Sequence, residues 1–143
     1  MRAGSLFIPV RDLENSATWY EQHLGVKRID GWGEGMGFYF PDGPTQLALI
    51  QTDAPPLTEF QMTEGRKNVY YNFLVSDIER LHSTFKQQGV MVGEIDNFGG
   101  MLCFDAMDPD GNVLSFVDEP ETSPYHSERI KARQLQDNSR TNT

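Results

Sequence analysis

Residues 70–81 read YYNFLVSDIERL, and they repeat a pattern that is already present near the N-terminus. A shift of 65 positions places Val10 on Val75 and Asp12 on Asp77. The match continues through an aromatic residue in each helical segment to a Gly-Val pair after it. Self-similarity with only two copies indicates a duplicated module rather than a long repeat array. We therefore predict two modules of one design.

Each copy carries the same order of secondary-structure signals. Alternating apolar residues predict a strand at 5–10, and Asp12 stands where a helix N-cap belongs. A Pro-Asp-Gly turn, at 41–43 and again at 109–111, precedes the last apolar strand of each copy. The expected strands are 5–10, 26–30, 36–40 and 46–51 in the first copy and 69–75, 91–95, 101–107 and 113–117 in the second, with helices from Asp12 to Gly25 and from Asp77 to Gly89.

These signals predict an α+β fold in which two tandem βαβββ modules form a curved mixed sheet with a concave cup. Within the expected linker, we expect a short helical turn at 59–62 after two adjacent prolines. A helix is expected at 127–135 in the polar C-terminal part. The predicted division is a first module at 1–51, a linker at 52–68, a second module at 69–118 and a C-terminal extension at 119–143.

Composition narrows the range of partners. The 143 residues include 12 Lys and Arg against 21 Asp and Glu, a net charge of −9. This charge argues against a nucleic acid or an anionic membrane as partner. The single cysteine, Cys103, excludes an intramolecular disulfide and suits a reducing compartment. No signal-peptide pattern and no apolar run of about 20 residues is present, so we predict a cytoplasmic protein.

Side chains alternate along a strand, so residues that face the helices can be separated from those that face away. The helix-facing set is apolar and contains Leu6, Ile8, Val10, Leu47, Leu49, Tyr71, Phe73, Val75, Leu114 and Phe116. The opposite set is more mixed and contains Ser5, Phe7, Gln46, Ala48, Ile50, Tyr70, Asn72, Leu74, Val113, Ser115 and Val117. If the modules meet edge to edge, we expect this second set to line a concave small-molecule site.

Three motifs carry a family resemblance. They are Ile8-Pro9-Val10-Arg11-Asp12-Leu13, Phe73-Leu74-Val75-Ser76-Asp77-Ile78 and the turn Asp108-Pro109-Asp110-Gly111-Asn112. Over residues 4–118 the chain resembles the vicinal oxygen chelate superfamily, which contains glyoxalases, extradiol dioxygenases, fosfomycin-modifying enzymes and bleomycin-resistance proteins. The resemblance implies paired βαβββ modules around a cup, commonly in a homodimer. It also implies, for catalytic members, a divalent metal held by side chains on the first and last strands of each module.

The metal-ligand positions of the family fall on Ser5, Ala48, Tyr70 and Ser115 of this sequence. A divalent ion needs imidazole nitrogen or carboxylate oxygen from the protein. None of these four side chains supplies either group, and the amide of Gln46, two residues from Ala48, is alone a weak ligand. We therefore expect no metal at the family's position and no cofactor.

The remaining candidates have a structural and a functional interpretation each. Tyr70 and Asn72 either fill the volume of the lost metal or orient a ligand. Aromatic rings at Phe7, Trp32 and Tyr39 either belong to the core or form flat walls for a ring-bearing ligand. Cys103 can point into the cup, but a lone thiol usually behaves as a small hydrophobe.

Three hypotheses about function follow. The first is a metal-independent small-molecule binding protein, similar to the bleomycin-resistance type, that sequesters a toxic or cationic ligand. The second is a lyase, isomerase or dioxygenase-like enzyme with a displaced metal or an acid–base site centred on Tyr70. The third is an interaction module whose C-terminal extension docks a partner. The predicted ligand-binding residues are Ser5, Phe7, Tyr39, Ala48, Tyr70, Asn72, Cys103 and Ser115.

Overall fold

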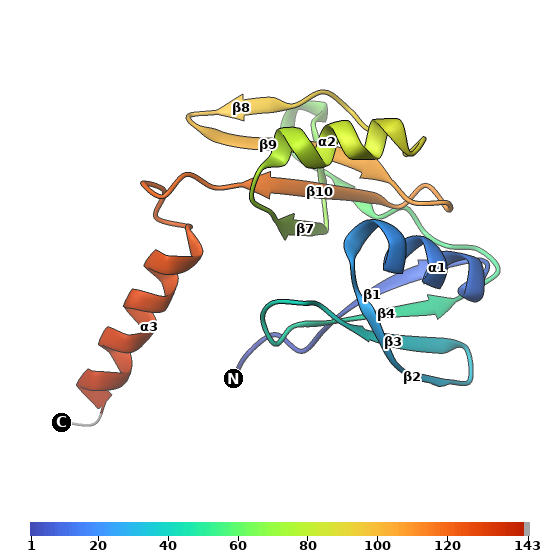
Figure 1. Ribbon diagram of the computed structural model, residues 1–143, viewed down its shortest axis with the longest axis horizontal. Helices are drawn as coiled ribbons and strands as arrows, with labels where there is room; N and C mark the ends of the chain where they lie inside the picture. The colour runs from blue at the N-terminus through green and yellow to red at the C-terminus, as the bar shows by residue number, and fades with distance from the viewer. Residues whose placement is uncertain (142–143) are drawn as a thin grey trace.

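The computed structural model describes residues 1–141 and contains two four-stranded mixed sheets, each with one long helix between its first two strands (Figure 1). The first sheet has the order β1 (Ser5–Val10), β4 (Gln46–Gln51), β3 (Gly35–Tyr39), β2 (Lys27–Trp32). The second has the order β7 (Tyr71–Leu74), β10 (Val113–Asp118), β9 (Met101–Met107), β8 (Asp96–Phe98). In each sheet the strands that come first and last in sequence pair in parallel, β1 with β4 and β7 with β10. The other pairs are antiparallel. The α+β prediction with paired modules is confirmed.

The two helices begin differently although their sequences match. Helix α1 (Leu13–Leu24) is capped by Asp12, whose Oδ1 accepts a hydrogen bond from the Asn15 backbone N–H at 3.1 Å. Gly25 ends it in the left-handed conformation with φ of 70°. Helix α2 (Ile78–Gln87) starts after Asp77, which occupies the cap position but has φ of 53° and makes no side-chain cap. The predicted cap position is right, and the predicted capping bond is absent there.

The predicted helical turn at 59–62 is wrong. Strand β5 (Glu59–Gln61) pairs antiparallel with β6 (Lys67–Val69), and the 3₁₀ turn η1 (Thr63–Gly65) joins them. Gly65, with φ of 72°, allows the chain to reverse within a few residues. The hairpin is attached to the second sheet because the Thr58 hydroxyl accepts a hydrogen bond from the Val113 backbone N–H at 2.9 Å.

Two strand predictions in the second copy also need correction. The strand expected at 69–75 is interrupted at Tyr70, where β6 ends and β7 begins. The strand expected at 91–95 contributes only an isolated bridge between Val92 and Ala106, and β8 forms later at Asp96–Phe98. The turn at Gly99 and Gly100, both with positive φ, sets this register by folding β8 directly onto β9.

One apolar core joins the helix-facing sides of both modules. Six of the predicted helix-facing residues are almost fully buried, namely Ile8, Val10, Leu47, Leu49, Leu114 and Phe116 at 0–2% exposure. Rings cross from module to module: His23 of α1 meets Phe85 of α2 with centroids 5.7 Å apart, and Phe40 meets Phe73 at 5.8 Å. The two modules therefore contact each other through their helix-facing sides.

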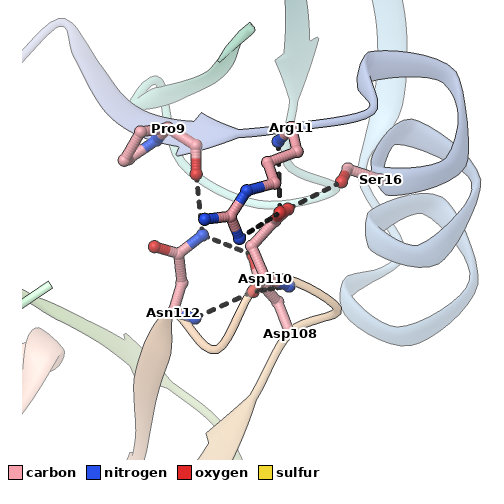
Figure 2. A network of polar contacts seen from close by, with 6 residues as sticks. All are labelled: Pro9, Arg11, Ser16, Asp108, Asp110 and Asn112. Atoms are coloured by element: carbon pink, nitrogen blue, oxygen red, sulfur yellow. Dashed lines mark hydrogen bonds and ion pairs between the residues drawn. The ribbon is translucent and has the colours of Figure 1, made fainter. Parts of the chain in front are cut away.

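The turn before β10 attaches the second module to the first (Figure 2). Oδ1 of Asp108 accepts the backbone N–H groups of Asp110 and Asn112, at 2.8 and 2.9 Å, which closes the turn. Its Oδ2 accepts a hydrogen bond from the Tyr20 hydroxyl of α1 at 2.8 Å and another from the Asn112 side-chain amide at 2.7 Å. That amide also donates to the Pro9 carbonyl at 2.8 Å. Asp108 therefore both closes this turn and binds it to the first module.

Helix α3 (Ser127–Thr141) follows β10 and projects from the two modules (Figure 1). It is longer than the segment at 127–135 predicted from the sequence, and none of its residues is buried. Within residues 1–141, no helix is long and apolar enough to span a membrane.

Candidate functional site

A cavity of about 690 Å³ lies on the second sheet. Its walls come from the sheet face opposite α2, from the segment before β8, and from the β5–β6 hairpin. The lining residues are Glu59, Lys67, Asn68, Val69, Tyr70, Asn72, Gly93, Glu94, Asp96, Phe98, Met101, Cys103, Phe104, Asp105, Ser115 and Val117. The volume is in the range typical of small-molecule sites.

Strand register explains how the polar side chains meet. Ser115 of β10 is the partner of Asn72 in β7 and of Asp105 in β9, so these three form a row across the sheet. The next row contains Val117 and Cys103. Because side chains alternate, the residues between these rows point into the core under α2. The open face therefore carries a hydroxyl, an amide, a carboxylate and a thiol within one small area.

Charge around the cavity is strongly unbalanced. Four carboxylates line it, from Glu59, Glu94, Asp96 and Asp105, against the single amine of Lys67. Burial raises the pKa of Asp105, and the neighbouring carboxylates of Glu59 and Asp96 add to this, while a hydrogen bond with Ser115 opposes it. Asp105 is nevertheless exposed on this face of the sheet. The cavity therefore favours a positively charged guest.

Cys103 is a poor nucleophile in this setting. Burial raises the pKa of its thiol, and the charges of Asp96 and Asp105 raise it further. A thiolate is the reactive form of cysteine, and these neighbours disfavour it. The arrangement fits the sequence-based interpretation of Cys103 as a small wall residue.

The structure brings together half of the predicted ligand-binding residues. Tyr70, Asn72, Cys103 and Ser115 all line the cavity. The other four, Ser5, Phe7, Tyr39 and Ala48, lie on the first sheet and take no part in its lining. Within one chain, this cavity is thus lined by the second module and the hairpin. The role of all eight residues in ligand binding stays a prediction.

The corresponding face of the first sheet carries an aromatic surface. Trp32 pairs with Gly35, and its indole lies so close that a Cβ added to Gly35 would be 2.4 Å from the ring. The same ring passes Gly37 at 3.6 Å from such a Cβ position. Trp32 is 51% exposed, and Phe7 and Tyr39 on the same sheet are 58% and 46% exposed. Glycine in β3 therefore leaves the room that the flat-lying indole occupies.

A family model describes most of this chain. The model named Glyoxalase/Bleomycin resistance protein/Dioxygenase superfamily matches residues 2–116. The chain belongs to this superfamily. The match covers both sheets and ends within β10, so α3 lies outside it. No curated protein matches the chain.

Solved structures of the superfamily share the fold at low identity. TnmS3, an antibiotic binding protein from Streptomyces sp. CB03234, has a TM-score of 0.68 at 17% identity and covers 84% of this chain and 97% of its own. A superfamily member from Sphaerobacter thermophilus DSM 20745 has a TM-score of 0.66 at 23% identity, covering 83% and 98%. A lactoylglutathione lyase from Agrobacterium tumefaciens has a TM-score of 0.62 at 16% identity, covering 82% and 92%. At these identities the likeness establishes the fold alone.

The superfamily's metal does not fit the side chains at its expected position. Ser5, Ala48, Tyr70 and Ser115 offer hydroxyl groups and a methyl group, without imidazole or carboxylate. Ser5 and Ala48 also lie apart from the cavity that Tyr70 and Ser115 line. Among residues 1–141, no three His, Cys, Asp or Glu side chains are grouped in a way that could hold a metal ion.

Several cavity residues were not anticipated from the sequence. Glu59 and Lys67 lie on the hairpin, and that region reads as a plain linker until its pairing is known. Glu94 and Asp96 flank Ile95, and this polar–apolar–polar alternation was the available signal that both carboxylates share one side. Because the strand was expected at 91–95 and β8 forms at Asp96–Phe98, the two carboxylates were not assigned to the cavity.

Proposed function

We propose that this superfamily member binds a cationic, ring-bearing small molecule in the cavity of the second module, without a metal ion. The observation that carries the proposal is the presence of four carboxylates and one amine around a cavity of small-molecule size. Tyr70 and Phe98 also line the cavity, from opposite edges of the second sheet, and each is 61% exposed. Aromatic faces attract organic cations. Charge and rings thus favour the same class of guest.

The polar row provides the means to orient such a guest. Asp105 and Asn72 stand on either side of Ser115, so a protonated amine can be paired with the carboxylate while the amide accepts or donates a second hydrogen bond. This assigns to Asn72 the orienting role that the sequence left open. The homodimer and the cytoplasmic location expected from the sequence stay predictions.

A titration with two flat dyes tests the proposal. We expect acridine orange, a planar cation, to bind with micromolar affinity in calorimetry, and fluorescein, a planar anion, to give no measurable heat. Replacement of Glu94 by Gln and of Asp105 by Asn should each weaken acridine orange binding by roughly 2- to 10-fold, as expected for one partly solvated charge. Asp42→Asn removes an equal charge from an exposed turn and is the matched control.

The same titration distinguishes the alternatives. Binding that persists unchanged after dialysis against a chelator supports the metal-independent site. Equal binding of both dyes, or an Asp105→Asn/Glu94→Gln double variant that binds as well as the parent, would refute the cationic guest. An enzyme of the lyase or dioxygenase type would instead lose its ligand or activity on chelation or on the change Tyr70→Phe.

A further inference from the structure

Helix α3 lacks the contacts that normally stabilise a helix of its length. It has 15 residues, projects away from both modules, and buries none of its side chains within the described chain (Figure 1). An isolated helix of about 12–15 residues is marginal in water, and packing usually supplies its stability. Two of its apolar side chains face solvent, Ile130 at 39% and Leu135 at 72% exposure. These features indicate a surface that a partner covers.

The charge of α3 is opposite to that of the rest of the chain. Residues 127–141 contain four Lys or Arg and two Asp or Glu, a net charge of +2. The remaining residues contain eight Lys or Arg and nineteen Asp or Glu, a net charge of −11. A second copy of the same chain therefore presents an anionic body to this cationic helix.

The positive charge is concentrated on one side of the helix. Arg129, Arg133 and Arg140 follow one another at spacings of four and seven, which places them on one face together with Asp137, so this face carries a net charge of +2. Like charges four residues apart destabilise a helix in water. Lys131 lies on another side and pairs with Glu128 at 3.0 Å. The arginine face, defined by Arg129 and Arg133, thus suits an acidic surface better than solvent.

The segment before α3 holds the helix away from its own body. Nε of Arg129 donates to the Glu121 carbonyl at 2.8 Å, and two further turns are closed by the Ser123 N–H to Pro120 and by the His126 N–H to Ser123. These bonds set the direction in which α3 leaves β10. Another molecule can meet the arginine face without breaking them.

We propose that α3 is an exchanged arm. Its arginine face packs on the acidic second module of another copy, and the α3 of that copy packs on the second module of the first. The receiving surface is the rim formed by Glu94 and Asp96, both exposed on the segment that leads into β8. An exchange of this kind is isologous, so it closes at a dimer. The same two carboxylates line the cavity, so a docked arm and a cationic guest compete for them.

Light scattering and sedimentation on the full chain test this arm. We expect a dimer in dilute buffer whose dissociation constant rises at least about tenfold in the variant Arg129→Glu/Arg133→Glu, and which weakens as salt screens the contact. The control Arg66→Glu/Lys86→Glu makes the same change in net charge at two exposed positions of the body. It should shift the constant by less than about twofold.

A charge swap identifies the receiving surface. Glu94→Lys/Asp96→Lys alone should also weaken the dimer. Mixing it with Arg129→Glu/Arg133→Glu should produce a heterodimer, because one arm–rim contact then has its native charges and the other has them exchanged. A chain that is monomeric at all concentrations, or a dimer that the arginine changes leave intact, would overturn the proposal. A mixture that stays monomeric would overturn the rim as the docking surface. The two proposals are tested apart: Arg129→Glu/Arg133→Glu changes no residue of the cavity and tests the arm, whereas acridine orange binding by the parent chain tests the cation site.

Discussion

The open face of the first sheet is aromatic, whereas that of the second sheet is acidic, although both sheets have the same strand order. In the first, Trp32 lies over two glycines of β3 beside Phe7 and Tyr39. In the second, Asp105 and its neighbouring carboxylates surround a cavity. The helix-facing sides remained alike because they share one core, in which a change of size on either side disturbs both modules. The duplicated fold thus carries two chemically different surfaces on one scaffold.

The turns before the last strands differ in the same way. The turn containing Asp42 in the first module is exposed throughout, while the corresponding turn of the second module buries Asp108 and Asn112, and Asp108 binds the Tyr20 hydroxyl of α1. The second turn therefore also binds α1 and β1 of the other module, in addition to reversing the chain. This difference gives the largest effect that we expect from a single substitution.

Asp108→Ala should lower the free energy of unfolding by about 3 kcal/mol. It leaves the buried Tyr20 hydroxyl and two backbone N–H groups without their acceptor. Urea unfolding followed by circular dichroism measures the change. Asp42→Ala, in the other module's turn, should stay within about 0.5 kcal/mol of the parent. Equal losses in both variants would contradict the assignment of the junction to the second turn.

Gly35→Ala should cost about 1–2 kcal/mol and change the tryptophan emission, because the new Cβ would lie 2.4 Å from the Trp32 indole and displace it. Gly93→Ala in the second module is the matched control, since its nearest neighbour is the Asp105 carbonyl at an ordinary 3.8 Å. Stability and fluorescence are read from one denaturation series. An unchanged emission maximum in Gly35→Ala would show that the ring does not rest on this glycine.

Acidification should weaken cation binding to the second module at a pH above the one at which an ordinary aspartate takes up a proton. The pKa of Asp105 is raised, mainly by burial, so its carboxylate takes up a proton at a higher pH than the usual pKa of about 3.9. As the pH falls through that raised pKa, one negative charge is lost and affinity for acridine orange drops by roughly 2- to 10-fold. In Asp105→Asn this part of the pH dependence should vanish. If the variant keeps the full dependence, another group is responsible.

Cys103 offers the smallest of these tests. Its thiol pKa is raised by burial and by the charges of Asp96 and Asp105. Asp96→Asn removes one of these charges, lowers the pKa of the thiol, and should speed alkylation by iodoacetamide near pH 8 by about twofold. Asp42→Asn should leave the rate unchanged. A slower reaction in Asp96→Asn would contradict the acidic character of this face.

Many of the strands and helices were predicted from the sequence because packing against the core makes apolar residues recur at the spacing of a strand or a helix. The bounds 5–10, 46–51 and 101–107 agree with β1, β4 and β9, where each strand alternates against a helix or a buried neighbour. The failures have a common cause. The β5–β6 hairpin and the shift of β8 depend on pairing partners and on glycine turns, which a linear pattern does not contain.

The candidate site was predicted only in part for the same reason. Asn72, Cys103 and Ser115 follow from strand alternation alone, and they do line the cavity. Glu59 reaches the cavity because a hairpin brings it there, and Asp96 because β8 folds onto β9. The charge of the site thus depends on tertiary pairing. A count of acidic residues along the chain could not place it.

The contacts of the Asp108 turn with β1 and α1 have a consequence for synthesis. They join residues 88 to 103 positions apart, as in the bonds from Tyr20 to Asp108 and from Asn112 to Pro9. Such non-local contacts form late, after a long loop has closed. During translation, the first module therefore emerges from the ribosome before the turn that completes its helix-facing side exists. Its apolar surface stays uncovered until nearly the whole superfamily domain has been made, and this interval is when a chaperone would bind the nascent chain.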